Sequence, residues 1–204
     1  MFKISLNLLI LKSKFFLFFI SLTPLTRLIY LGWNDALGAN PVEFVERSTG
    51  TWALVFLLIT LSITPMKQWF SLSAFNQHRR MFGLYMFFYA CLHILAYSWL
   101  DHWFDYIEIS KDVIKHPFVL VGFTAFMFSI PLAATSTNAM MRRLGGRWKV
   151  LHQLVYVIAV LAILHFLWLV KKDHTEPLVY TGVFILLIAL RIAYKYRRFI
   201  RTHV

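Results

Sequence analysis

The chain has little charge, a single cysteine and no glycine-rich nucleotide motif. Only 15% of its 204 residues are charged, whereas about 25% is usual for a soluble domain. The lone cysteine, Cys91, excludes an intrachain disulfide. The lack of a G-x-G-x-x-G fingerprint argues against binding of NAD(P)H in the usual way. These absences exclude an ordinary soluble domain.

Long apolar segments take the place of charge. Hydrophobic residues make up 59% of the chain, and the mean hydropathy is +0.65. A membrane-spanning helix needs about 20 mostly apolar residues, or about 17 at the short end, and a helix satisfies its own backbone polar groups within lipid. We therefore expect an all-α membrane protein, a six-transmembrane-helix bundle forming one domain over residues 1–204. The six expected spans are 15–33, 50–66, 81–100, 118–135, 150–170 and 178–194.

The charges between these segments predict the orientation of the bundle. The N-terminal segment, the 67–80 and 136–149 loops and the C-terminal tail contain Lys and Arg but no acid, and all nine acidic residues fall in the alternate loops. Lys and Arg mark the cytoplasmic side, so both termini are expected there. The net charge of +12 is then a topology signal, with anionic lipid as a partner and no nucleic acid. The first segment lacks an A-x-A-like cleavage site, so we expect it to remain as a span. We expect no internal repeat.

Three histidines lie within the apolar segments. His93 is in the third segment, and His152 and His165 are in the fifth, thirteen residues apart. An ionisable or metal-binding side chain in hydrocarbon is costly and indicates function by default. Imidazole is a good axial ligand of haem iron, and without a C-x-x-C-H motif any haem would be held without thioether bonds. The pattern favours haem b in the core of the bundle.

The third and fifth segments run in the same direction, so the depths of their histidines can be compared. His93 lies thirteen residues past Arg80, about 20 Å along a helix, and His165 lies eighteen residues past Arg147. Both are therefore expected in the outer half, as the two ligands of one haem. His152, about 20 Å from His165 along the axis, would serve a second haem near the inner surface. Because thirteen residues do not return to the same helix face, this second site needs a bend or a twist.

The inner site has no obvious second ligand. His78 could ligate the iron, Arg79 could pair with a haem propionate, and His152 could instead bind a flavin or a quinone. Nearby basic residues, Arg147 among them, would suit a propionate or a flavin phosphate, although topology alone explains them. Two roles without haem also remain open for the histidines. One is hydrogen bonding between helices, and the second is a proton relay, which usually involves intramembrane Asp or Glu.

Four stretches resemble the MsrQ (YedZ) family over nearly the whole chain. They are GANPVEFVERSTG, LLITLSITP, RRMFGLYMFFYACLH and TSTNAMMRRLGGRWKVLHQLVYVIAVLAILHFLWLVK. The ordered set is specific, whereas one piece alone would be weak. A more distant similarity is to the ferric-reductase and NADPH-oxidase membrane domain, which carries two histidines on each corresponding helix. Here the third segment supplies only His93 in the matching pattern.

This resemblance implies a haem-binding subunit of the bacterial periplasmic methionine-sulfoxide reductase system, multi-pass in the cell inner membrane. The family's haem-ligand histidines fall on His93, His152 and His165, and the family is described as binding haem b and FMN. It takes electrons from the quinone pool or a cytosolic flavin reductase. It passes them to MsrP, a periplasmic molybdopterin enzyme that reduces methionine sulfoxide, a reversible lesion.

Together, the residues and the resemblance predict a membrane cytochrome b with one haem or two, which moves electrons outward. The chain has no apparent terminal catalytic site, so its status as an enzyme stays open and a partner would complete the chemistry. Two alternatives remain. One is a free-standing ferric or superoxide-generating reductase that uses the outer haem directly. The other is a transporter or scaffold with structural histidines and no cofactor.

Overall fold

Every regular element in the described part of the chain is a helix. The computed structural model describes residues 2–70 and 73–203, with side chains described for 13–70 and 76–201. Six helices in these ranges are long and apolar enough to cross a membrane, which confirms the all-α class and the expected number of candidate spans. They are built from α1 (Phe2–Trp33), α2 (Pro41–Phe70), α3 (Arg79–Ala96), α5 (Pro117–Ala134), α8 (Leu154–Leu169) and α9 (Thr175–His203).

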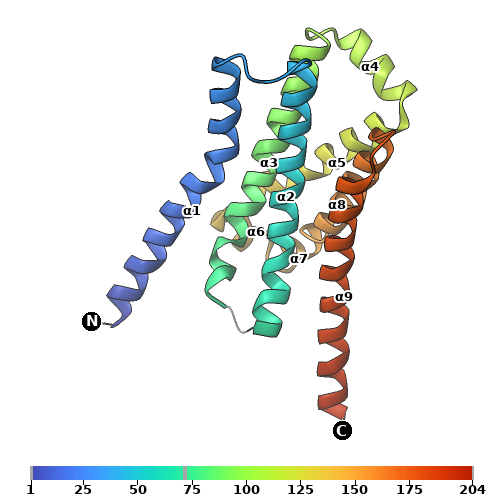
Figure 1. The fold of residues 1–204 in the computed structure, drawn as a ribbon. Coiled ribbons are helices and arrows are strands. Elements are labelled where there is room, and N and C mark those ends of the chain that lie inside the picture. Colours follow the sequence, from blue (N-terminus) through green and yellow to red (C-terminus); the bar gives the residue numbers. More distant parts are fainter. Residues whose placement is uncertain (1, 71–72, 204) are drawn as a thin grey trace.

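Helix α2 lies at the centre of the bundle. Half of its most apolar window is buried, against 11% in α1 and in α9, so α2 packs on protein while α1 and α9 present most of their surface outward. Figure 1 shows α2 and α3 side by side between these two outer helices. Phe56 of α2 stacks on Tyr85 and Tyr89 of α3, each with ring centroids 5.4 Å apart. Aromatic packing of this kind stabilises the helix pair beyond simple burial.

A tyrosine of α3 attaches α1 to the bundle. Pro24 has no backbone N–H and interrupts the hydrogen-bond ladder of α1, which bends along its length (Figure 1). The Tyr89 hydroxyl bridges the next pair of the ladder: it accepts from the Leu25 N–H at 3.3 Å and donates to the Ser21 carbonyl at 2.9 Å. Side-chain insertion into the ladder is a recognised cause of helix bending.

Short helices occupy connections that we expected to be loops. The Asp105 carboxylate accepts from the N–H groups of Ile107 and Glu108, at 2.9 and 3.0 Å, and so caps the first turn of one of them. An Asp followed three residues later by Glu is a start signal for a helix, which the loop prediction missed. The short helices are α4 (Tyr106–Lys115), α6 (Asn138–Leu144) and α7 (Gly146–Leu151), with a 3-10 turn at Ser73–His78 and a π-helical turn at Tyr97–Asp101.

The two ends of the bundle differ in charge. Both chain termini lie at one end (Figure 1), where the connecting segments carry lysine and arginine but no acid; we call it the basic end. The opposite end carries α4 and the connections from α1 to α2 and from α8 to α9, and all nine acidic residues belong to these segments or to the adjoining helix ends. We call it the acidic end.

Candidate cofactor site

His93 of α3 is held by the backbone of α2. Its Nδ1 lies 2.9 Å from the carbonyl oxygen of Glu46. Because a carbonyl oxygen only accepts, Nδ1 carries the proton and donates it. In the neutral ring, Nε2 then keeps the lone pair that a metal ion needs.

His165 of α8 is held in the same way by α5. Its Nδ1 donates to the carbonyl oxygen of Phe118 at 2.7 Å, which again leaves the Nε2 lone pair available. Metal-binding histidines almost always donate their second ring N–H to a carbonyl, a carboxylate or water, because this fixes the tautomer and the ring orientation. Both histidines therefore have the geometry of prepared ligands.

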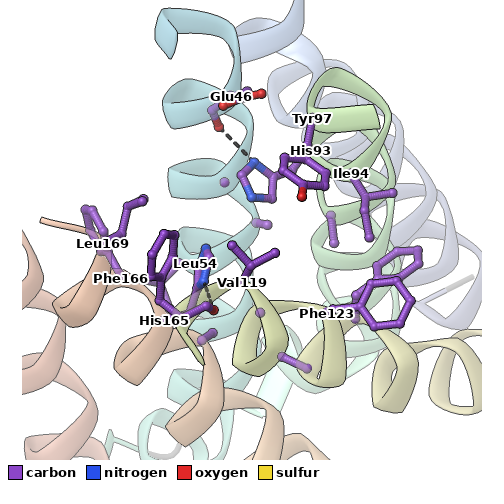
Figure 2. A pocket seen from close by; sticks show the side chains of 18 of the residues that line it. Glu46, Leu54, His93, Ile94, Tyr97, Val119, Phe123, His165, Phe166 and Leu169 are labelled. Carbon is purple, nitrogen blue, oxygen red and sulfur yellow. Dashed lines mark hydrogen bonds between the residues drawn. The ribbon is translucent and has the colours of Figure 1, made fainter. Parts of the chain in front are cut away.

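The two histidines lie on one cavity between α2, α3, α5 and α8 (Figure 2). Their ring centroids are 6.2 Å apart, with the ring planes at 71°. Bonds from a metal ion to imidazole nitrogen are about 2.0–2.1 Å long, so rings at this separation are close enough to bind one ion from two sides. The cavity has a volume of about 410 Å³, within the range of small-molecule and cofactor sites. Its apolar walls include Leu54, Met86, Phe123, Phe126, Ile158 and Phe166.

The two histidine units are built alike. In each, the accepting carbonyl lies 47 residues before the histidine, and a glycine, Gly50 or Gly122, lies four residues after that carbonyl. The pattern A-x-L-H-x-L occurs at residues 90–95 and again at 162–167. The expectation of no internal repeat is therefore wrong here: the pairs α2–α3 and α5–α8 share one arrangement. The repeated hexapeptide was the signal that sequence reasoning missed.

Polar side chains fasten α4 across the acidic end of the cavity. Asp112 of α4 accepts from the Tyr97 hydroxyl at 2.6 Å and from Nδ1 of His116 at 2.7 Å. Burial alone would raise the pKa of the Asp112 carboxyl, but these two hydrogen bonds and the nearby histidine charges outweigh it, and the pKa falls below its ordinary value. Asp112 therefore stays ionised and links the end of α3 to α4 and to the start of α5.

His152 lies near the basic end, at a break between α7 and α8. Its ring stacks on Trp148, with centroids 3.9 Å apart, and its Nε2 lies 3.1 Å from the Thr135 hydroxyl oxygen. That hydroxyl donates its own hydrogen to the Pro131 carbonyl at 2.6 Å, so His152 Nε2–H is the donor to Thr135. The break supplies the bend that a second site needs, yet the ring nitrogen facing α5 already has a protein partner.

The other candidates at the basic end lie at the start of α3 and on α7. His78 is buried at the start of α3, with Nε2 at 3.4 Å from Ser13 of α1 and 3.3 Å from Gln77. Arg79 lies close enough to His152 for its charge to act on that ring. Arg147 is exposed on α7. Of these candidates, Arg79 is the one whose charge acts on His152.

Arg191 of α9 is a polar residue in the half of the bundle nearer the basic end, and the sequence reasoning missed it. Its guanidinium donates to the Leu61 carbonyl and to the Tyr156 hydroxyl. The Leu61 carbonyl is available because residue 65, one turn later in α2, is Pro65, which has no N–H to offer it. The signal was a lone arginine inside the last apolar segment, where charges are rare and usually functional or paired.

Known proteins resemble the chain over most of its length. The family model described as "Ferric reductase like transmembrane component" matches residues 49–163. The haem-binding subunit MsrQ of protein-methionine-sulfoxide reductase from Herminiimonas arsenicoxydans is 47% identical over 91% of this chain and 86% of its own length. The MsrQ of Bordetella parapertussis is 50% identical over 92% of each chain, and that of Ralstonia nicotianae is 50% identical over 87% of this chain and 83% of its own. The chain belongs to the MsrQ family.

Membership of the MsrQ family makes this a ferric reductase-like membrane protein. The matched range, 49–163, contains Gly50, His93, Gly122 and His152 and stops just short of His165. It therefore covers most of both helix pairs of the cavity and leaves out α1, the end of α8 and all of α9. No solved structure matches this MsrQ chain significantly.

Proposed function

We propose that the chain is the electron-transfer subunit of a methionine-sulfoxide reductase system and holds haem b between His93 and His165. The observation that carries this proposal is the pair of Nδ1–H···O=C hydrogen bonds to Glu46 and Phe118, which leave two Nε2 lone pairs on one apolar cavity. Axial ligation by two imidazoles fits this donor set.

The protein contributes position and environment. The carbonyls of Glu46 and Phe118 fix the tautomer and the direction of each ring. Leu54, Met86 and Phe166 give the cavity apolar walls, and the dielectric around a redox centre is one of the factors that set its potential. When bound, the haem supplies one-electron chemistry, which no side chain of the cavity can supply.

We propose that electrons enter at the basic end and leave at the acidic end. This orientation puts both termini in the cytoplasm and the protein in a bacterial inner membrane, because lysine- and arginine-rich connections favour that side; the same residues would contact anionic lipid. The donor would be the quinone pool or a cytosolic flavin reductase, and the acceptor a periplasmic MsrP-type molybdopterin enzyme. These partners, and FMN as a second cofactor, rest on the family resemblance alone.

A second haem at the basic end is part of the same proposal only if His152 can act as a ligand. The helix break at His152 and the nearby charge of Arg79 are compatible with such a site, and Arg79 would then pair with a propionate. Because Nε2 donates to Thr135, His152 would ligate through Nδ1, or would have to give up this hydrogen bond to ligate through Nε2.

The test is a reduced-minus-oxidised optical spectrum of the purified protein, with haem measured per chain. We expect a b-type spectrum and one haem or two. A colourless protein that is folded by circular dichroism would contradict the proposal and favour a transporter or scaffold with structural histidines.

A free-standing ferric or superoxide-generating reductase is the second candidate. The observation in its favour is that the cavity extends to the exposed residues Asp101 and His116 at the acidic end, where a small acceptor could approach. Rapid reduction of a ferric chelate or of oxygen by the haem-loaded protein, without any partner protein, would favour this candidate.

A further inference from the structure

Two glycines lie directly against the histidine rings of the cavity. A Cβ atom added to Gly122 would lie 2.7 Å from Nδ1, 2.9 Å from Cε1 and 3.0 Å from Cγ of His165. A Cβ atom on Gly50 would lie 3.1 Å from both Nδ1 and Cε1 of His93. Any residue other than glycine would therefore press on the imidazole at both positions.

We infer that Gly50 and Gly122 are positioning residues for the haem ligands. Each lies one helical turn after the carbonyl that accepts from the same histidine, Glu46 for His93 and Phe118 for His165. The missing side chain lets the ring lie against the helix so that Nδ1 reaches this carbonyl while Nε2 stays on the cavity. The inference rests on the proposed function, since it concerns the ligands of the haem.

The contact with the ring distinguishes these glycines from packing glycines. Small residues in membrane helices commonly allow two backbones to approach, and a Cβ at a purely packing glycine would first meet the neighbouring backbone. At Gly50 and Gly122 the nearest atoms all belong to an imidazole ring. Gly83 of α3 shows the contrast, because its Cβ would meet only a methyl group of Thr60, at 3.8 Å.

A displaced ring changes the ligand even where the protein can adapt. The histidine side chain can rotate away from a new methyl group, but this rotation lengthens the hydrogen bond from Nδ1 to the carbonyl. It also turns Nε2 away from its position on the cavity. Loss of such a supporting interaction typically lowers metal affinity by about 10- to 100-fold. The shorter distances at Gly122 predict a larger effect there than at Gly50.

The test compares Gly122→Ala and Gly50→Ala with two matched controls, Gly83→Ala and Gly182→Ala. Gly182 lies in α9, and nothing is within 4 Å of its added Cβ. The measurements are haem affinity by titration, the low-spin ferric electron paramagnetic resonance spectrum, which reports the orientation of the axial imidazoles, and helicity by circular dichroism. We expect about 10- to 100-fold weaker haem binding and an altered spectrum in Gly122→Ala, smaller changes of the same kind in Gly50→Ala, and neither in the controls.

The outcomes separate this inference from the proposed function. If His93→Ala and His165→Ala bind haem as the unchanged protein does, the proposed ligands are wrong. If those variants lose haem while both glycine variants keep normal affinity and an unchanged spectrum, the ligands stand and the positioning role is wrong. If Gly122→Ala does not fold, the spectrum of Gly50→Ala decides: no change overturns the inference, and a shifted spectrum supports it.

Discussion

The acidic and basic halves of the bundle use the same kind of hydrogen bond in different surroundings. In both, a group of α2 or α5 accepts a hydrogen bond from a side chain of a neighbouring helix. At the acidic end the donors are His93 and His165, and each ring keeps a second nitrogen on a cavity. At the basic end the donors include Arg191, which is bonded to Leu61 and Tyr156, and His152, which is bonded to Thr135.

This difference indicates which histidines are positioned to act as metal ligands at the cavity. A ring that is oriented by one nitrogen and free at the other is ready to bind a metal ion without rearrangement. His152 is instead oriented through Nε2, stacks on Trp148 and does not line the cavity. The acidic end is therefore the open site, and the basic end is a set of polar contacts that hold helices together.

The largest expected effect is the loss of haem from the acidic end. His93→Ala and His165→Ala should each abolish that haem, because removal of either ligand breaks the same two-histidine site. His152→Ala should leave it at least partly intact, since His152 contacts Trp148 and Thr135 and does not line the cavity. Haem per chain and the optical spectrum of each purified variant measure the effect.

The same three histidine variants can contradict this assignment of the haem to the acidic end. If His152→Ala removes all haem while His165→Ala spares it, the acidic end is not the primary site. A matched control, His174→Ala in the exposed connection from α8 to α9, should change neither haem content nor spectrum.

Arg191→Met tests whether the polar contacts of the basic half stabilise the fold and leave haem binding unaffected. The substitution leaves the Leu61 carbonyl without its donor, and a buried unsatisfied polar group costs about 1–3 kcal/mol. We expect a loss of this size in the free energy of unfolding, measured in detergent, with no change in haem content. Lys195→Met, an exposed charge on the same helix, is the control and should have little effect.

Pro65→Ala sharpens this test. Alanine restores an N–H that can bond to the Leu61 carbonyl within α2, so Arg191→Met should cost less in the Pro65→Ala background than alone. A double-mutant cycle measures this coupling. Equal costs in both backgrounds would mean that the carbonyl of Leu61 is not what Arg191 stabilises.

Hydropathy and helix rise were sufficient to predict six long apolar helices and to pair His93 with His165, whose ring centroids are 6.2 Å apart. They were insufficient for contacts between distant segments. The partner of Arg191 exists only because Pro65, in another helix, leaves a carbonyl free. The engagement of His152 likewise depends on Thr135, at the end of α5. Such pairings follow from helix packing, which the spacing of residues along one segment does not contain.

Thr135→Val addresses the basic-end histidine directly. Valine removes the hydroxyl that accepts from His152 and donates to the Pro131 carbonyl, and we expect a loss of about 1 kcal/mol in stability with unchanged haem at the acidic end. Thr135→Ser should restore most of the stability. Thr124→Val is the matched control, because that hydroxyl bonds only to the preceding turn of its own helix, at 2.8 Å. Loss of haem in Thr135→Val would contradict the separation of the two ends.

The smallest expected effect is at Asp112, which holds α4 across the cavity. Its side chain is 23% exposed, so Asp112→Asn should cost a few tenths of a kcal/mol to about 1 kcal/mol, together with faster release of haem to a scavenging protein. Glu108→Gln is the control on the same helix, since that carboxylate is 66% exposed and its ion pair with His102 is long, at 4.0 Å.

The stability difference between the unchanged protein and Asp112→Asn should depend on pH. Because the pKa of Asp112 is lowered in the folded protein, its contribution is fully present above its ordinary value of 3.8 and is lost as the pH falls through the folded-state pKa. The unchanged protein should therefore be more stable than Asp112→Asn at neutral pH, and the difference should shrink below pH 3.8. Equal stability and equal haem release at neutral pH would mean that α4 is held over the acidic-end cavity by its apolar contacts alone.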